Sequence, residues 1–123
     1  MKSFRLLMFT TALLAVLAVA TPAAKAQDIV KVAPQKCKVL LDNDRVRVIR
    51  VVNEPGGKVP MHSHPPYIAY ALTSGTERLT SPNGRVVINT LKAGHATWSN
   101  GATHSGKNIG KTEIRVVLIE LKK

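Results

Sequence analysis

Two histidines separated by one residue, His62 and His64, are the side chains of this sequence best placed to do chemistry. In an extended strand, residues i and i+2 point to the same side, so both imidazoles face one point. A third histidine, His104, follows a glycine-punctuated stretch far along the chain. Three neutral nitrogen ligands with a vacant position are a common way to hold a catalytic metal. We therefore predict a metal site at His62, His64 and His104.

The elements that must position these histidines are predicted to be short β-strands separated by turns. Alternation is clear in residues 46–52, where we expect Val46 and Val48 to face inward. Ser81-Pro82-Asn83-Gly84 predicts a hairpin, and residues 113–121 form a long strand rich in β-branched residues. Such strands, with no helical period between them, predict an all-β fold. The expected form is a small antiparallel barrel or jelly roll whose mouth can hold one ligand or metal.

The first 26 residues predict a cleaved signal peptide. Lys2 and Arg5 form a positive start, an apolar run extends from residue 6 to residue 20, and Ala24-Lys25-Ala26 has small residues at the cleavage positions. The run falls short of the ~20 residues that span a bilayer, so we expect no transmembrane segment in the mature chain. We predict one domain, residues 27–123, in the periplasm or outside the cell.

The predicted mature chain is basic, with 15 Lys and Arg against 7 Asp and Glu. These charges are scattered rather than gathered in one run, and aromatic residues are few, so we expect no nucleic-acid partner. An anionic envelope polymer or lipid head group suits the charge better. The single cysteine, Cys37, excludes an internal disulfide and is expected to be buried, with a free thiol or a bond between chains as the alternatives.

The glycine frame around the histidines resembles the cupin family. Gly56, five residues, His62-Ser63-His64 and then Gly75 resemble the first cupin motif. The second motif is matched by Gly94, Gly101, His104 and Asn108, which fix the expected position of the third histidine. The resemblance implies a cupin barrel for residues 27–123, with these histidines as metal ligands. It also implies a homodimer, because small cupins often pair.

Two positions depart from the family pattern. The glutamate that cupins use as a ligand would fall at Ile68, and the proline of the second motif is replaced by Ser99. Without the carboxylate, a nitrogen-only site favours Zn, Fe, Ni or Cu over Mn. Three-histidine cupins that resemble this arrangement include iron dioxygenases.

Three further residues are candidates for the pocket wall, namely Ile68, Tyr70 and Trp98. Tyr70 is expected to share a face with Ile68, where its hydroxyl could reach a ligand, or else to be an amphipathic core residue. His95 is expected to be a surface turn residue, and Asn108 to fix the local backbone.

Three functions stay open at this point. The first is a metal-dependent activity, such as that of a dioxygenase or isomerase, on a small molecule such as an anionic metabolite or a sugar. The second is a non-catalytic module of the cell envelope that binds a ligand or the metal itself, which the absent carboxylate favours. The third is an interaction protein whose basic surface docks an anionic polymer.

Overall fold

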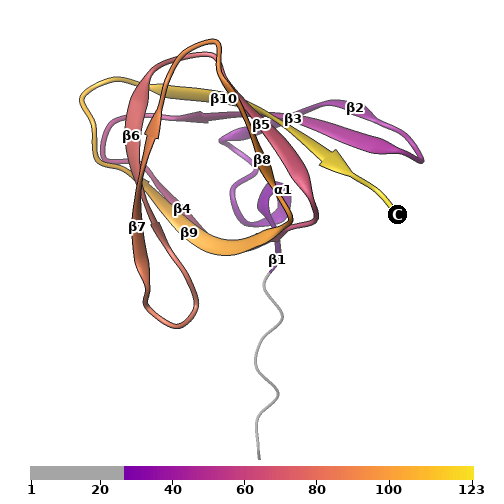
Figure 1. The fold of residues 1–123 in the computed structure, drawn as a ribbon, viewed down its shortest axis with the longest axis horizontal. Helices are drawn as coiled ribbons and strands as arrows, with labels where there is room; N and C mark the ends of the chain where they lie inside the picture. The colour runs from indigo at the N-terminus through magenta and orange to yellow at the C-terminus, as the bar shows by residue number, and fades with distance from the viewer. Residues whose placement is uncertain (1–26) are drawn as a thin grey trace, which may run out of the picture.

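The computed structural model describes residues 27–123 as two facing five-stranded sheets with one short helix between them (Figure 1). The predicted signal peptide, residues 1–26, lies outside the described residues. In chain order the elements are β1 (Gln27–Asp28), α1 (Ile29–Val32), β2 (Cys37–Asp42), β3 (Val46–Asn53), β4 (Lys58–His64), β5 (Tyr67–Ala71), β6 (Gly75–Thr80), β7 (Val86–Leu91), β8 (Ala96–Ser99), β9 (Ala102–Asn108) and β10 (Ile114–Leu121). The predicted all-β barrel or jelly roll is confirmed.

The first sheet has the strand order β1-β4-β9-β6-β7 and the second has β2-β3-β10-β5-β8. Every pairing is antiparallel except that of β1, which runs parallel to β4 with Gln27 opposite His62. The predicted hairpin joins β6 and β7, where Gly84 has a φ of 84° that favours glycine. No helix among residues 27–123 is long and apolar enough to cross a membrane.

The core lies between the sheets, and α1 contributes to it. Asp28 caps this four-residue helix by accepting a hydrogen bond from the backbone nitrogen of Val30 at 2.8 Å. Ile29 and Ala33 are buried against aliphatic residues of β3, β4 and β10, namely Ile49, Val51, Val59 and Leu118. The first residues of the described chain therefore plug the barrel from within.

The expected inward face of β3 is corrected by the structure. Its buried apolar residues are Ile49 and Val51 rather than Val46 and Val48, so the strand is turned by one position. The reason is Arg47, which lies on the inner face and pairs there with Glu120 of β10. An inward arginine reverses the simple rule that charged residues mark the outer face of a strand.

Candidate metal centre

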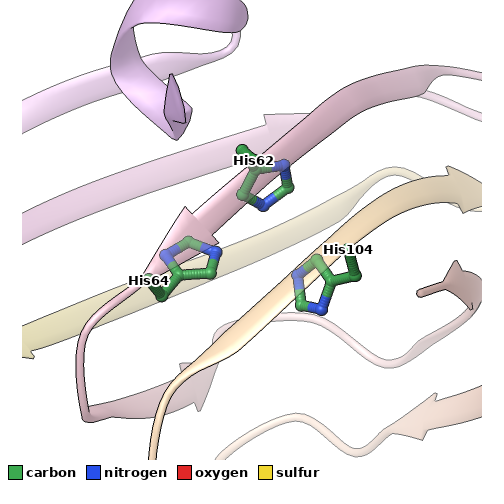
Figure 2. Close-up of side chains that lie close together, drawn as sticks. All are labelled: His62, His64 and His104. Carbon is green, nitrogen blue, oxygen red and sulfur yellow. The ribbon is translucent and has the colours of Figure 1, made fainter. Parts of the chain in front are cut away.

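The three predicted ligands come together on two neighbouring strands of the first sheet (Figure 2). His62 and His64 lie on β4, and His104 lies on β9 directly opposite His62. The ring centroids of His62 and His64 are 4.7 Å apart, and those of His62 and His104 are 4.9 Å apart. One ring nitrogen from each histidine can be chosen so that all three lie within 4.8 Å of one another.

A hydrogen bond sets the tautomer of His62. Its Nδ1 lies 2.7 Å from the carbonyl oxygen of Pro60. A carbonyl oxygen only accepts, so Nδ1 carries the proton and donates, which leaves the lone pair of Nε2 free. His62 is therefore oriented as a metal ligand is, with one nitrogen held by the protein and the other available.

The environment favours the neutral form of two of the histidines, His62 and His104. Burial, followed by the neighbouring imidazoles of His62 and His64, lowers the pKa of His104 to about 4. Burial also lowers the pKa of His62, although the Pro60 carbonyl partly offsets it. Neutral imidazole is the form that binds metal, so these rings can act as ligands even in mildly acidic solution.

His64 is held differently, because its Nδ1 is buried and has no hydrogen-bond partner among residues 27–123. Glu120 Oε2 lies 3.8 Å away, beyond hydrogen-bond length but close enough for a charge interaction. The Glu120 carboxylate is itself almost fully buried and accepts a hydrogen bond from Arg47 Nη2 at 2.8 Å. Burial raises the pKa of Glu120, but His64 and Arg47 together lower it by more than burial raises it. The pKa of Glu120 is therefore below the ordinary value for a glutamate.

A second carboxylate completes this partly buried chain of charges. Arg47 also pairs with Asp28, the residue that caps α1. Asp28, Arg47 and Glu120 therefore connect the helix inside the barrel to a histidine of the cluster. This carboxylate–histidine arrangement is typical of residues that lie behind a metal ligand.

The three histidines line a cavity of about 80 Å³ between the sheets. Its other polar side chains are Asn53, Tyr67 and Glu77. The Tyr67 ring centroid is 4.8 Å from that of His64. The remaining walls are mostly aliphatic and come from both sheets and α1, including Ile29, Val51, Val59, Ala69, Leu79, Ile114, Val116 and Leu118. The space holds a few heavy atoms, far below the ~300 Å³ of a drug-sized pocket.

Burial changes the acid–base character of the two ionisable residues among these, Tyr67 and Glu77. It raises the pKa of Tyr67 despite a hydrogen bond with Ser99, so the phenol stays protonated. It also raises the pKa of Glu77, an effect that the hydrogen bond from Asn89 Nδ2 at 2.9 Å partly offsets. The cavity therefore offers one phenol donor and one carboxyl group that protonates more easily than an exposed one.

The three predicted pocket residues lie elsewhere, which corrects the expectation. Ile68, Tyr70 and Trp98 are on the outer face of the second sheet, and Tyr70 and Trp98 are 40% and 56% exposed. Inward positions of β5 are Tyr67, Ala69 and Ala71, one step out of phase with Ile68. Ile68 follows His64 by four positions, so uninterrupted alternation would put both side chains on the same face. The Pro65-Pro66 turn breaks this alternation, and Tyr67 faces inward instead.

The other sequence expectations have clear outcomes. His95 is exposed beside the Gly94 turn, as expected. Asn108 is fully buried, and its amide donates to the carbonyl oxygens of Asn53 and Thr112, so it does fix the local backbone. Cys37 is half-buried, and burial raises the pKa of its thiol to about 11.

Sequence reasoning missed Tyr67, Glu77 and the Asp28–Arg47–Glu120 chain. A signal for Glu120 was present, since it is the one acidic residue within the apolar strand Ile114–Leu121. For Tyr67 the signal was its place in the sequence, directly after His64 and two prolines. Glu77 had no local signal, because a polar residue in an alternating strand normally faces solvent.

Comparison with known proteins places this geometry in a family. No family profile matches the chain, and no curated protein matches it. Among solved structures, a cupin domain from Bordetella pertussis Tohama I is 32% identical with a TM-score of 0.66, over 71% of this chain and 92% of that one. A DMSP lyase from Ruegeria pomeroyi is 17% identical with a TM-score of 0.56, and the match covers 71% of this chain and 46% of the lyase chain. A polyketide cyclase from Streptomyces resistomycificus is 19% identical with a TM-score of 0.55, and the match covers 71% of this chain and 64% of the cyclase chain.

The two enzymes share only the fold with this protein at these identities. The Bordetella domain is similar in sequence as well, over nearly its whole length. The barrel, the paired histidines on β4 and the third histidine on β9 agree with that similarity. The chain belongs to the cupin superfamily.

Proposed function

We propose that His62, His64 and His104 hold a divalent metal ion and that the cavity beside them receives a small molecule. The observation that carries this proposal is the convergence of three buried or half-buried histidines. Burial lowers the pKa of His62 and of His104, which favours their neutral, metal-binding form. His62 is already fixed in a ligating tautomer, and a carboxylate lies behind His64. The donors fit a metal, and nitrogen ligands favour Zn, Fe, Ni or Cu over Mn.

Bound there, a divalent ion supplies Lewis acidity or, for a redox metal, oxygen activation. The protein's own groups add positioning and proton control. The Tyr67 hydroxyl can donate a hydrogen bond to an oxygen of the small molecule, and Glu77 can take up or release a proton at its carboxyl group. Neutral histidines leave the metal's charge unbalanced, so an anionic molecule is the ligand class that we propose. A dioxygenase- or isomerase-like reaction suits these groups.

The test is metal binding by the mature protein and by two histidine variants. We expect one equivalent of Zn²⁺, Fe²⁺, Ni²⁺ or Cu²⁺ per chain by elemental analysis after reloading. His104→Ala should weaken binding by at least about 100-fold, because it removes one of three ligands. His95→Ala is the matched control, since His95 is exposed at a turn, and should bind as the unaltered protein does. If the reloaded protein binds none of the four metals, the proposal is wrong.

The alternative is a cupin that binds its ligand or metal without turnover. The small cavity favours it, because about 80 Å³ leaves little room for a substrate together with a co-reactant. Loaded protein would then bind a small anion at the site and convert none of the small acids, sugars and phenols in a turnover screen. Metal-dependent turnover that disappears in His104→Ala would exclude this alternative.

We also propose that the protein is exported and acts in the periplasm or outside the cell. The positive start, apolar run and small-residue cleavage site of residues 1–26 support this. N-terminal sequencing of the protein from a fractionated culture tests it. A Gln27 terminus is expected, and an intact Met1 in the cytoplasmic fraction would contradict the proposal.

A homodimer is the assembly that we propose. One row of apolar residues crosses the outer face of the second sheet, strand by strand. In pairing order the row is Leu41, Val48, Ile119, Ile68 and Trp98, which we call the apolar row. Strands lie ~4.8 Å apart, so the row is roughly 19 Å long. Leu41 and Trp98 at its ends are exposed, and the three residues between them are partly exposed. An apolar strip of this length suits contact with a second copy of the chain.

A further inference from the structure

A groove of about 390 Å³ lies on the outer face of the first sheet, on the side away from the histidines. Its residues come from β4, β6 and β9, and they are Lys58, Val59, Pro60, Arg78, Thr80, Ser105, Gly106 and Lys107. Val59 and Gly106 line this groove as well as the internal cavity, so the sheet itself separates the two. The groove is therefore a second hollow, distinct from the metal centre.

Three cations lie side by side in this groove. Lys58 is opposite Lys107, and Lys107 is opposite Arg78, so one positive charge stands on each of three adjacent strands. The strand spacing places their backbones ~4.8 Å apart. Like charges at directly opposite positions repel and destabilise a sheet. Among residues 27–123, none of the three forms an ion pair that would relieve this repulsion.

The remaining polar side chains of the groove are also hydrogen-bond donors. Thr80 and Ser105 lie opposite each other on β6 and β9, in the row next to the cations. The groove contains no carboxylate, so it offers ammonium, guanidinium and hydroxyl groups together. A ligand that suits it carries more than one negative charge and several acceptor oxygens. Phosphate has both properties, and Arg and Lys are the side chains that bind it most often.

We propose that this groove binds the phosphate group of a small phosphorylated molecule. Arg78 and Lys107 stand on neighbouring strands and hold the phosphate, Lys58 adds the third charge, and the hydroxyls of Ser105 and Thr80 donate to its remaining oxygens. The proposal does not depend on the metal centre, because none of the three cations, Lys58, Arg78 and Lys107, lines the cavity beside the histidines.

The test uses inorganic pyrophosphate as the probe and follows backbone amide signals of the full mature protein by NMR. We expect saturable shifts at Ser105, Gly106 and Lys107. The variant Arg78→Gln/Lys107→Gln should weaken binding by at least about tenfold. The matched control is Lys38→Gln/Arg50→Gln, which removes an opposed basic pair from the second sheet and the same total charge. It should change the affinity less than about twofold.

Three outcomes overturn the proposal. Equal weakening in the two double variants would mean that only the overall charge attracts the probe. Shifts that do not saturate would mean that there is no site. Loss of pyrophosphate binding in His104→Ala would place the probe on the metal instead. Circular dichroism of each variant establishes that it is folded before it is scored.

A soluble ester and a lipid head group share this chemistry, so two further arms separate them. Glycerol 3-phosphate that competes with pyrophosphate supports a soluble ligand. Sedimentation with phosphatidylglycerol vesicles, lost in Arg78→Gln/Lys107→Gln, supports a head group in the same groove. Vesicle binding that survives this double variant, without competition by the soluble ester, contradicts the groove as the phosphate site.

Discussion

At the scale of single residues, His64 depends on a carboxylate from a distant strand. Glu120 is only 2% exposed, and a buried charge is expensive unless it is paired. Arg47 supplies that pairing, yet Glu120 keeps one oxygen directed toward His64. The Glu120 carboxylate therefore interacts with both Arg47 and His64. Its removal should change the affinity of the metal centre.

We predict that Glu120→Gln lowers metal affinity by about 10- to 100-fold, because the ring of His64 loses the negative charge behind it. Competition with a chromogenic chelator measures the effect. Glu113→Gln is the control, since Glu113 forms an exposed ion pair with Arg115 and should leave the affinity unchanged. A folded Glu120→Gln protein with unaltered affinity would show that Glu120 serves the fold alone.

The neutral histidines also predict how stability depends on pH. The pKa of His104 is about 4 in the folded protein and ~6.5 in the unfolded chain. Between these values the unfolded chain binds a proton that the folded protein does not, so the free energy of unfolding falls as the pH falls. For this half-buried ring we expect a loss of about 1–2 kcal/mol between pH 7.5 and pH 5, after allowing for solvent screening.

Urea unfolding of metal-free protein at the two pH values measures this loss. His62 acts in the same direction, because its pKa is lowered too. In His104→Gln the group that titrates is gone, and the pH dependence should shrink by the His104 share. A free energy of unfolding that rises toward pH 5 in the unaltered protein would contradict the assignment of neutral rings.

The ligands could be predicted from the sequence, whereas the pocket wall could not. His62 and His64 share a strand face by simple alternation, and the glycine frame located His104. The wall depends on which face of β5 turns inward after the Pro65-Pro66 turn. Tyr67 and Ile68 differ by one position, and a shift of one position exchanges the two faces of a strand.

At the scale of elements, the strands could be predicted from the sequence, but the α1 helix that plugs the barrel (Ile29–Val32) could not. Residues 46–52, the hairpin at Ser81–Gly84 and residues 113–121 match β3, the β6–β7 turn and β10 closely. The α1 helix has four residues, too few to show a period in the sequence. Its position between the sheets is decided by tertiary packing of Ile29, which no local pattern encodes.

The plug should matter for stability far more than its length suggests. We predict that Ile29→Ala lowers the free energy of unfolding by about 2–5 kcal/mol, because Ile29 is buried at the junction of three strands and lines the cavity. The control is Leu40→Ala in β2, which is 50% exposed and should change it by less than ~0.5 kcal/mol. Urea unfolding compares them, and equal losses would mean that α1 does not contribute to the core.

At the scale of the whole molecule, the residues wrongly assigned to the pocket define a surface. Ile68 and Trp98 belong to the apolar row, on the opposite side of β5 and β8 from the cavity. The basic groove lies on the other sheet. The apolar row and the basic groove therefore lie on the outer faces of opposite sheets, with the metal centre between them.

We predict that the purified protein is a dimer and that Trp98→Lys makes it a monomer, since the new charge would be buried in the contact. Sedimentation velocity measures the change. Val86→Lys is the matched control, because Val86 is 51% exposed on β7 of the first sheet and should leave the dimer intact. A monomeric unaltered protein, or a dimer that both variants retain, would place the contact elsewhere or exclude it.

The chain of charges behind His64 also has a consequence for the order of events during synthesis. Arg47 is 19 positions from Asp28 in the sequence but 73 positions from Glu120. The charged residues behind His64 therefore come together only after β10 has been synthesised and has paired with β3. Contacts between residues so far apart require closure of a long loop, which slows folding. An emerging chain would display His62 and His64 long before the carboxylate behind them. On the proposed function, metal loading therefore follows closure of the barrel, and a chain halted before β10 carries histidines without a finished site.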